Sequence, residues 1–333
     1  MQRRRSDADW LAAAARLAVR ARPLSSPNPG VAAILVKDNA VVGRGWTQAG
    51  GRPHAEAVAL RQAGDDARGA TLYVTLEPCA HPSDRGPACS DLIAKAGLAA
   101  MVYAVEDPDP RTAGDGAKRI AEAGTPVRQV RCPSAGDSLS GYLTRKQLGR
   151  PHVTLKLAMS LDGCIALANG TSQWITEDAA RAHVHSRRAM ADAILVGGGT
   201  WRSDKPRLDV RLPGLEQRSP DRYVLSRGAA PDGVSIVSSP QAISGIPNAQ
   251  YLYVEGGAKT AAAFLAADLV DTVHLYRAPI FIGGGAPSVT DIGLSDLASA
   301  HDRWTLTERT QLGSDLLEVY QRRADTRCPK ERN

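Results

Sequence analysis

His54-Ala55-Glu56 lies in the first half of the chain, which also contains Thr75-Leu76-Glu77-Pro78-Cys79 and a second cysteine, Cys89. A neutral imidazole and two thiolates are good zinc ligands, and three such ligands leave a fourth position for water. Bound zinc lowers the pKa of that water, so that hydroxide is available near neutral pH. Glu56 follows the histidine by two residues, where it can move protons to and from this water. We therefore predict a catalytic zinc site with these three ligands.

The segments around the predicted ligands indicate the elements that hold them. Residues 55–61 favour a helix with His54 at its first turn, and residues 70–76 are a largely apolar run typical of a buried strand. Cys89 begins a second amphipathic helix, and a helix N-terminus favours the thiolate form of cysteine. Three unrelated packed side chains are the alternative. The agreement between the strand-end and helix-start contexts favours the zinc site.

The same residues are arranged as in zinc-dependent base deaminases, although nine residues separate the two cysteines here, where the general signature has two. With this long loop and with Asp107-Pro108-Asp109-Pro110 after it, the chain resembles the bifunctional deaminase–reductases of riboflavin biosynthesis. The resemblance resumes in the second half at residues 155–163, 172–176, 193–197 and 254–257. It covers nearly the whole chain, with two motif sets in the expected order.

Length and patterning predict two α/β domains. The chain has 333 residues, 43% of them apolar, which is enough for two cores of ordinary size. We expect a helix over residues 135–149, and we place the boundary directly after it, at Arg150-Pro151. The two domains are then a zinc-dependent pyrimidine deaminase domain at 1–149 and an NADPH-dependent reductase domain at 150–325. The resemblance implies a cytidine-deaminase-like three-layer α/β sandwich for the first domain. For the second it implies a dihydrofolate-reductase-like α/β fold.

Four residues of the first domain match substrate contacts of the family. The resemblance implies that Asn28 hydrogen-bonds the pyrimidine, and that His81, Arg85 and Asp107 bind the base and the phosphoribosyl group. From the residues alone, Asn28 is equally a turn residue before proline, and Arg85 is a solvated loop charge. Asp109 stands where the family usually has asparagine, so we expect the local contact to differ there.

The second half has no Gly-x-Gly-x-x-Gly after a strand, so a Rossmann fold is unsupported. Instead, an apolar strand at 251–254 runs into Glu255-Gly256-Gly257 and a helix at 259–267. Glycines at such a junction allow the backbone to approach a phosphate at the positive helix N-terminus. A simple tight turn is the alternative reading. We expect the triple glycines at 197–199 and 283–285 to form turns.

The resemblance implies that the second domain binds NADPH and a phosphorylated substrate. Lys156 and Glu255 are candidates to polarise or position the open-chain sugar, and Lys156 joins Glu56 as a predicted catalytic residue. Ser226 stands where the family commonly has aspartate, and the segment 222–251 is shorter than in the family. The resemblance implies that both lie on the adenosine side of the cofactor. The implied cofactor contacts are Met159, Trp174, Thr200, Asp204 and Gly257. The implied substrate contacts are Ser172, Arg188, Leu208, Arg211 and Glu255, the two arginines being suited to phosphate.

The function that the resemblance implies has two consecutive steps. The first is zinc-dependent deamination of 2,5-diamino-6-(5-phosphoribosylamino)pyrimidin-4(3H)-one. The second is NADPH-dependent reduction of the ribosyl side chain, which gives 5-amino-6-(5-phosphoribitylamino)uracil. A nucleoside or tRNA base deaminase with an accessory domain is the alternative. A zinc-stabilised binding protein without activity is a further one, against which the intact Glu56 argues.

Composition bears on partners and compartment. The net charge of +6 suits nucleic acid, but it also suits a phosphorylated substrate and a dinucleotide phosphate. Aromatic residues are only 5%, which is sparse for stacking on single strands, so we expect no nucleic-acid partner. No run approaches the ~20 apolar residues of a membrane span. Five cysteines, two assigned to zinc, indicate a reducing cytoplasm. The family implies a homo-oligomer through the reductase domain.

Overall fold

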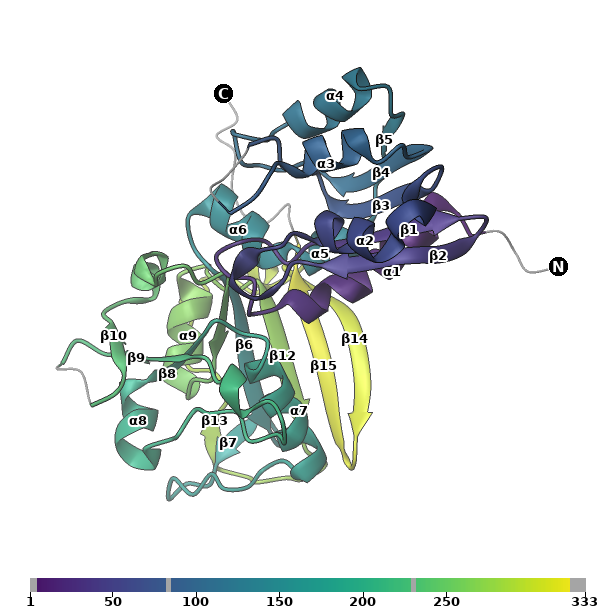
Figure 1. The fold of residues 1–333 in the computed structure, drawn as a ribbon. Coiled ribbons are helices and arrows are strands. Elements are labelled where there is room, and N and C mark those ends of the chain that lie inside the picture. The colour runs from purple at the N-terminus through teal and green to yellow at the C-terminus, as the bar shows by residue number, and fades with distance from the viewer. Residues whose placement is uncertain (1–4, 82–84, 229–231, 324–333) are drawn as a thin grey trace. The chain divides into compact units, whose positions relative to one another are not determined.

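The structure is a computed structural model of the chain, and it describes residues 5–81, 85–228 and 232–323 (Figure 1). The chain divides into two compact units, residues 1–149 and residues 150–333. Within the described ranges, no helix is long and apolar enough to cross a membrane. The predicted domain boundary lies at the same position as the division between the units. The end of the chain, residues 324–333, lies outside the described residues.

The first unit is built on a five-stranded sheet in the order β2-β1-β3-β4-β5. Strand β1 pairs antiparallel with β2 and β3, whereas β3, β4 and β5 run parallel. Because β3 and β4 are parallel, the segments that follow them leave the sheet at the same edge. The strands are β1 (Ala32–Lys37), β2 (Ala40–Trp46), β3 (Thr71–Leu76), β4 (Ala100–Val105) and β5 (Val127–Gln129).

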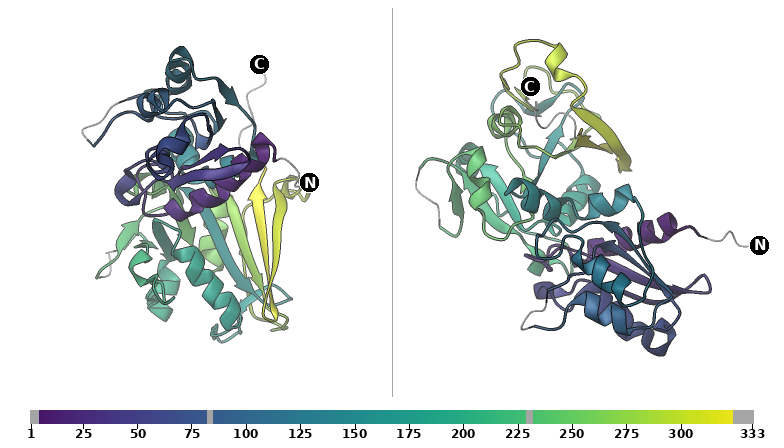
Figure 2. Two further views of the ribbon diagram at one scale, coloured as in Figure 1. Left: turned by 45° about the vertical axis from the view of Figure 1, so that its right-hand side comes forward. Right: turned by 90° about the horizontal axis from the view of Figure 1, so that it is seen from above.

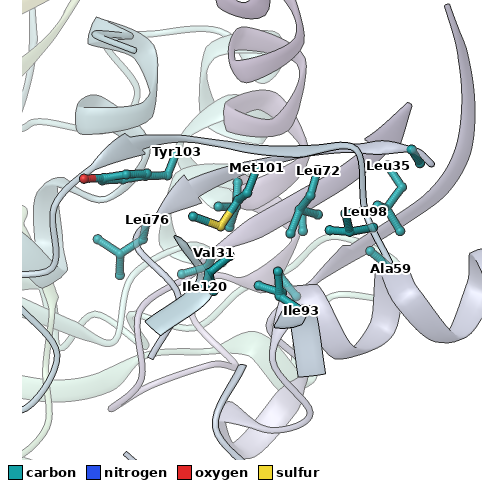
Figure 3. Close-up of a cluster of buried hydrophobic side chains, with 14 of the residues drawn as sticks. Val31, Leu35, Ala59, Leu72, Leu76, Ile93, Leu98, Met101, Tyr103 and Ile120 are labelled. Atoms are coloured by element: carbon teal, nitrogen blue, oxygen red, sulfur yellow. The ribbon is translucent and has the colours of Figure 1, made fainter. Parts of the chain in front are cut away.

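Helices cover both faces of this sheet and make three layers (Figures 1 and 2). Residues of α2, α3, α4 and α6 share one apolar core with the sheet, and Figure 3 shows Ile93 of α3 meeting Leu72 and Met101 of the strands. Residues of α1 and α5 share the core on the other face. The helices are α1 (Asp7–Ala18), α2 (Ala55–Ala63), α3 (Cys89–Lys95), α4 (Asp115–Glu122), α5 (Pro133–Ser138) and α6 (Ser140–Leu148).

Two glycines of β2 set the position of α2. A methyl group on Gly43 would collide with the backbone oxygen of Ala59, and one on Gly45 would collide with the backbone oxygen of Ala55. The backbone of the helix therefore lies directly on the strand, closer than any larger residue permits. Since His54 immediately precedes α2, this contact also fixes where the predicted zinc ligand lies.

The second unit is built on an eight-stranded sheet in the order β10-β9-β8-β11-β6-β12-β15-β14. The strands from β10 to β12 are parallel, and β15 and β14 add an antiparallel edge. A separate pair joins β7 to β13. The strands are β6 (His152–Met159), β7 (Cys164–Ala166), β8 (Ala193–Gly197), β9 (Asp221–Leu225), β10 (Ser235–Val237), β11 (Tyr251–Val254), β12 (Thr272–Arg277), β13 (Ala286–Pro287), β14 (Trp304–Leu312) and β15 (Asp315–Arg322).

Helices lie on both faces of the second sheet as well. Helix α9 (Ala258–Ala266) packs Phe264 into one core, and α7 (Asp178–Arg188) packs Val184 into the other. The unit also has a short helix, α8 (Gly198–Asp204). Short 3-10 helices complete the two units: η1 (Val19–Ala21), η2 (Ala49–Gly51), η3 (Gly64–Ala67), η4 (Glu216–Arg218), η5 (Pro240–Gly245) and η6 (Ala298–Ala300).

Two expectations about local structure need correction. The triple glycine at 197–199 is not a free turn, because Gly198 and Gly199 form the first turn of α8. The N–H groups of this first turn have no intrahelical acceptor. The helix expected from 135 to 149 is two helices, separated at Leu139, whose ψ of 3° departs from helical geometry.

Candidate active sites

Three donor atoms meet at the edge of the first sheet. Nδ1 of His54 lies 3.6 Å from Sγ of Cys79 and 3.3 Å from Sγ of Cys89, and all three ligand atoms lie within 4.8 Å of one another. Cys79 follows β3, while His54 precedes α2 and Cys89 begins α3. One nitrogen and two sulfurs at this spacing fit a zinc ion with an open fourth position.

Electrostatics around these donors favour a bound cation. The Cys89 thiol and backbone N–H both donate to the Cys79 sulfur, and they contribute to lowering the pKa of Cys79 to about 4. A thiolate is the ligating form of cysteine. Glu56 lies in the first turn of α2 and its side chain is buried, which raises the pKa of its carboxyl. A carboxyl with a raised pKa takes up a proton more readily than a solvated carboxyl does.

Asn28 adjoins the metal-ligand cluster on the side away from the thiols. Its amide nitrogen lies 3.2 Å from Nε2 of His54 and donates to the backbone oxygen of Gly51 at 3.1 Å. The turn interpretation of Asn28 is therefore incomplete, because its side chain reaches across 26 residues of sequence to the histidine ring. This contact places the Asn28 amide at the wall of the site.

A cavity of about 440 Å³ opens onto the cluster. His54, Glu56 and Cys79 line it together with all four residues expected to bind substrate in this domain: Asn28, His81, Arg85 and Asp107. Nδ1 of His81 lies 3.4 Å from the Thr112 hydroxyl, and the exposed Arg85 donates to the backbone oxygen of Gly50 at 2.8 Å. The volume suits one small molecule of nucleotide size.

Glu77 lines the same cavity, but its carboxylate binds backbone groups at the start of α4. Its carboxylate accepts the backbone N–H groups of Gly114 and Ala117, both at 3.0 Å. These two residues flank the start of α4, so the carboxylate satisfies donors that the first turn leaves unpaired. The negative charge also suits the positive end of the helix. Glu77 thereby ties the segment before Cys79 to α4.

The second unit has a larger cavity, of about 600 Å³. It is bounded by residues from β6, α7 and α8 and from the segment after β11. Met159 is the one expected contact of this domain that does not line it. The expected residues that do line it are Lys156, Ser172, Trp174, Arg188, Thr200, Asp204, Leu208, Arg211, Glu255 and Gly257.

Arg188 and Glu255 form a bidentate ion pair inside this cavity. Nε and Nη2 of the arginine lie 2.6 and 3.0 Å from the two carboxylate oxygens, and Nη1 donates to the backbone oxygen of Asp209 at 2.9 Å. Burial acts to raise the pKa of Glu255, but the ion pair outweighs burial and lowers it. Arg188 is thus held by protein groups, whereas Arg211 is half exposed beside Asp209.

Lys156 is enclosed next to this pair. Burial lowers the pKa of its ammonium, Glu255 acts in the opposite direction, and Arg188 adds to the lowering. An amine whose pKa is lowered gives up its proton more readily than a solvated lysine does.

The junction between β11 and α9 has the shape that a dinucleotide phosphate needs. A methyl group on Gly256 would lie 2.5 Å from Cβ of Thr260, and one on Gly257 would lie 3.3 Å from the Thr200 hydroxyl. The backbone is thus in direct contact with its neighbours, and Gly257 is the N-cap of α9. Free backbone N–H groups at a helix start bind phosphate. These residues would hold a phosphate group of NADPH at the start of α9.

Comparison with known proteins identifies a family for each half of the chain. The model of the cytidine and deoxycytidylate deaminase zinc-binding region matches residues 4–105. The model of the RibD C-terminal domain matches residues 151–246 and 246–317. The riboflavin biosynthesis protein RibD of Mycobacterium tuberculosis is 38% identical over 308 residues, 87% of this chain and 90% of that protein.

The chain belongs to the bifunctional deaminase–reductases of riboflavin biosynthesis. RibD of Escherichia coli is 34% identical, covering 93% of this chain and 98% of that protein. The solved structure of Acinetobacter baumannii RibD matches with a TM-score of 0.83 at 34% identity, covering 95% of this chain and 99% of that one. A Thermotoga maritima structure matches with the same TM-score at 29% identity, covering 96% and 100%.

Membership of this family confirms several predictions. The two-domain α/β class is confirmed, with a cytidine-deaminase-like first domain and a reductase domain second. The first domain is a zinc-binding deaminase domain, and the second is of the reductase type that uses NADPH. Like its relatives, the chain is an enzyme that acts on a small substrate. The roles of individual residues remain predictions.

Residues that the sequence interpretation overlooked also line the two cavities. In the deaminase–reductase's first cavity these include Arg111, Tyr142 and Lys146. In the second, His185 accepts the backbone N–H of Arg211 through Nδ1 at 3.2 Å. The available signal was weak: Tyr142 and Lys146 are four apart on an expected helix, and such residues share one face. Nothing in their sequence context indicated what that face contacts.

Proposed function

We propose that the chain catalyses two consecutive steps on one phosphorylated pyrimidine. The observation that carries the proposal is the cluster of His54, Cys79 and Cys89 beside a cavity that the buried Glu56 also lines, in a chain with a second cavity in its reductase domain. The Thermotoga maritima relative is described as a diaminohydroxyphosphoribosylaminopyrimidine deaminase and 5-amino-6-(5-phosphoribosylamino)uracil reductase. We assign the same substrates to this chain.

The first step replaces the 2-amino group of 2,5-diamino-6-(5-phosphoribosylamino)pyrimidin-4(3H)-one by oxygen. A zinc ion held by His54, Cys79 and Cys89 would supply hydroxide near neutral pH. Glu56 takes the proton of the attacking water and delivers it to the leaving nitrogen, so that ammonia departs. Asn28 and Asp107 orient the ring, while His81 and Arg85 are the proposed contacts toward the phosphoribosyl group.

The second step reduces C1′ of the ribosyl group in the deaminated product. NADPH would supply the hydride, and the proposed cofactor contacts that line the cavity are Trp174, Thr200, Asp204 and Gly257. Lys156 donates a hydrogen bond or a proton to the opened sugar, because its side chain is enclosed beside the acid Glu255. The product is 5-amino-6-(5-phosphoribitylamino)uracil.

The phosphate contact of the second step is assigned to Arg211 in preference to Arg188. The guanidinium of Arg188 is occupied by Glu255 and by Asp209, so its task is to hold that carboxylate. Arg211 has a half-exposed side chain at the cavity rim. A charged hydrogen bond from arginine to phosphate is among the stronger contacts available.

The remaining partners follow from the same reading. A phosphorylated pyrimidine accounts for the positive charge without nucleic acid, and a homo-oligomer through the second domain in the cytoplasm stays our expectation. A tRNA deaminase would bind tRNA in a salt-sensitive way, and neither a tRNA deaminase nor a nucleoside deaminase would make use of a nicotinamide cofactor. This difference separates the alternatives experimentally.

The test is product analysis with zinc-loaded protein and the diaminopyrimidine phosphate. Without NADPH, we expect ammonia and the deaminated pyrimidine alone. With NADPH, we expect the ribityl product, two hydrogens heavier than the deaminated pyrimidine, and oxidation of one cofactor per molecule. Deamination of tRNA with no conversion of the pyrimidine would contradict the proposal.

A further inference from the structure

Helix α6 reaches into the deaminase cavity with two side chains. The Tyr142 hydroxyl donates to Oδ1 of Asp107 at 2.7 Å, and Nζ of Lys146 lies 2.9 Å from Oδ2 of Asp109. The tyrosine and lysine are four residues apart and so share one face of the helix. All four side chains line the cavity that contains the metal-ligand cluster. One helix thus contacts two acidic residues of the segment after β4.

These contacts fix the orientation of the Asp107 carboxyl. Oδ1 accepts a second hydrogen bond, from the backbone N–H of Asp109 at 3.0 Å, and the Asp107 N–H lies 3.4 Å from Oε2 of Glu77. In the described part of the chain, both donors to this carboxyl bind Oδ1. Oδ2 is therefore the oxygen available to a molecule in the cavity. An oriented acceptor binds a ligand donor with little loss of rotamer freedom.

Asp109 is held as an anion by two cations. Arg111 donates to it through Nε at 3.0 Å and through Nη2 at 2.7 Å, and Lys146 adds a third contact. The Arg111 guanidinium holds the pKa of this carboxyl well below its usual range, although burial opposes the effect. The charge of Asp109 would otherwise act against ionisation of its neighbour Asp107. Lys146 compensates for that charge.

We propose that Tyr142 and Lys146 are positioning residues for deamination, holding Asp107 as an ionised acceptor whose Oδ2 receives an N–H or O–H group of the substrate. This inference rests on the proposed function. Neither residue touches the reacting carbon, and each acts through a carboxylate. Their loss should therefore weaken substrate binding more than it slows the chemical step.

The pH dependence follows from the groups that face Asp107. Burial raises the pKa of its carboxyl and Asp109 adds to this, whereas the Asp109 N–H, Tyr142 and Lys146 lower it. From the end of β3, Glu77 accepts the Asp107 backbone N–H. Removing the Tyr142 hydroxyl takes away a stabiliser of the ionised form, so the pKa rises further. Ionised Asp107 is then lost at a higher pH, and the acid limb of kcat/KM moves upward.

Tyr142→Phe is the main test, with deamination measured by ammonia release on zinc-loaded protein. Relative to wild type, we expect the KM to rise about tenfold, as for loss of a hydrogen bond to a charged group. The kcat at optimal pH and the zinc content should be unchanged, and the acid limb should shift upward. Tyr73→Phe is the matched control, since Tyr73 also donates to a carboxylate, that of Asp7, away from the cavity.

Lys146→Met gives a second, independent test that does not depend on the tyrosine. We expect it to raise the KM, while Gln147→Met on the next exposed position of α6 should not. In an Asp109→Asn background, the charge that Lys146 compensates is gone. Lys146→Met should then raise the KM much less, so the effects of the two substitutions on the KM should be non-additive.

The outcomes separate this inference from the proposed function. An active wild type whose Tyr142→Phe variant keeps both the KM and the acid limb would overturn the inference alone. Additive effects of Lys146→Met and Asp109→Asn would overturn the role of Lys146. A zinc-loaded wild type that releases no ammonia would overturn the proposed function, and the inference with it.

Discussion

The donor atoms at the first site are held by single residues from three separate elements. His54 precedes α2, Cys79 follows β3, and Cys89 starts α3 with its backbone N–H 3.3 Å from the Cys79 sulfur. No one of these elements supplies two ligands. Each residue is therefore needed for metal binding, and we expect substitution of any one of them to weaken zinc binding strongly.

Cys89→Ser is predicted to remove zinc and deamination together, because a neutral hydroxyl is a poor zinc ligand compared with a thiolate. Wild type should contain about one zinc per chain, measured by elemental analysis of purified protein. Cys132→Ser and Cys164→Ser are the controls, since these buried free cysteines lie outside the cluster. Full zinc content in purified Cys89→Ser would contradict the ligand assignment.

Arg211→Ala is predicted to raise the KM for the reductase substrate at least tenfold more than the KM for NADPH, because a charge-assisted phosphate contact is lost. The sequence alone predicts the same for Arg188→Ala, but the structure changes that expectation. Loss of Arg188 leaves the carboxylate of Glu255 unpaired and mostly buried, which costs roughly 3–5 kcal/mol of stability. Thermal unfolding and two-substrate kinetics distinguish the two effects. Equal KM changes in Arg211→Ala would indicate a structural arginine.

Among the elements, α2 is the one whose placement the site depends on most. The contact between α2 and β2 exists because Gly43 and Gly45 lack side chains. The helix carries Glu56 in its first turn, directly after His54. A displacement of the helix by a few tenths of an ångström is transmitted to the proton-transfer group and to one metal ligand. The packing of α2 on β2 is thus coupled to metal binding and to proton transfer.

Gly45→Ala is predicted to destabilise the first unit by ~1–3 kcal/mol, as overpacking of a close contact does. The added methyl group meets the backbone oxygen of Ala55, which cannot rotate away. Zinc affinity should fall together with the unfolding temperature. Gly136→Ala in α5 is the control, because open space surrounds its Cβ position. Unchanged stability and unchanged zinc affinity in Gly45→Ala would show that α2 can shift freely.

Over the whole molecule, each of the two compact units contains one of the two candidate sites, with its own cavity and its own functional groups. Glu56 and the metal-ligand cluster belong to the first unit, and Lys156, Arg188 and Glu255 belong to the second. The cores are likewise separate. This organisation leads us to expect that each activity can be removed without the other.

Glu56→Gln is predicted to lower deamination by ~10²–10⁴-fold, the usual contribution of a general acid–base group. Reduction of supplied deaminated intermediate should stay near wild type, as followed by NADPH absorbance. Conversely, Glu255→Ala should spare ammonia release. If Glu56→Gln abolished reduction while zinc content and thermal stability were unchanged, a single shared site would have to replace the two-site assignment.

Much of the architecture was predictable from local patterns. Apolar runs at 70–76 and 251–254 correspond to β3 and β11, because buried parallel strands are nearly continuous in apolar residues. The strands β12, β14 and β15 were not predicted. Edge strand β14 is largely exposed, so its residues Thr305 to Thr310 show no apolar alternation from which a strand is recognised.

For the candidate sites, the sequence by itself determined the chemistry that is present. His54, Glu56, Cys79 and Cys89 identify a zinc site because few residue types bind zinc and their order along the chain is characteristic. Only the tertiary structure decided which charged side chains form ion pairs within the protein. Arg188 is taken by Glu255, and Asp109 by Arg111 and Lys146, through contacts of which two span 67 and 37 residues. Such pairings depend on how the elements pack, and no local pattern of residues records them.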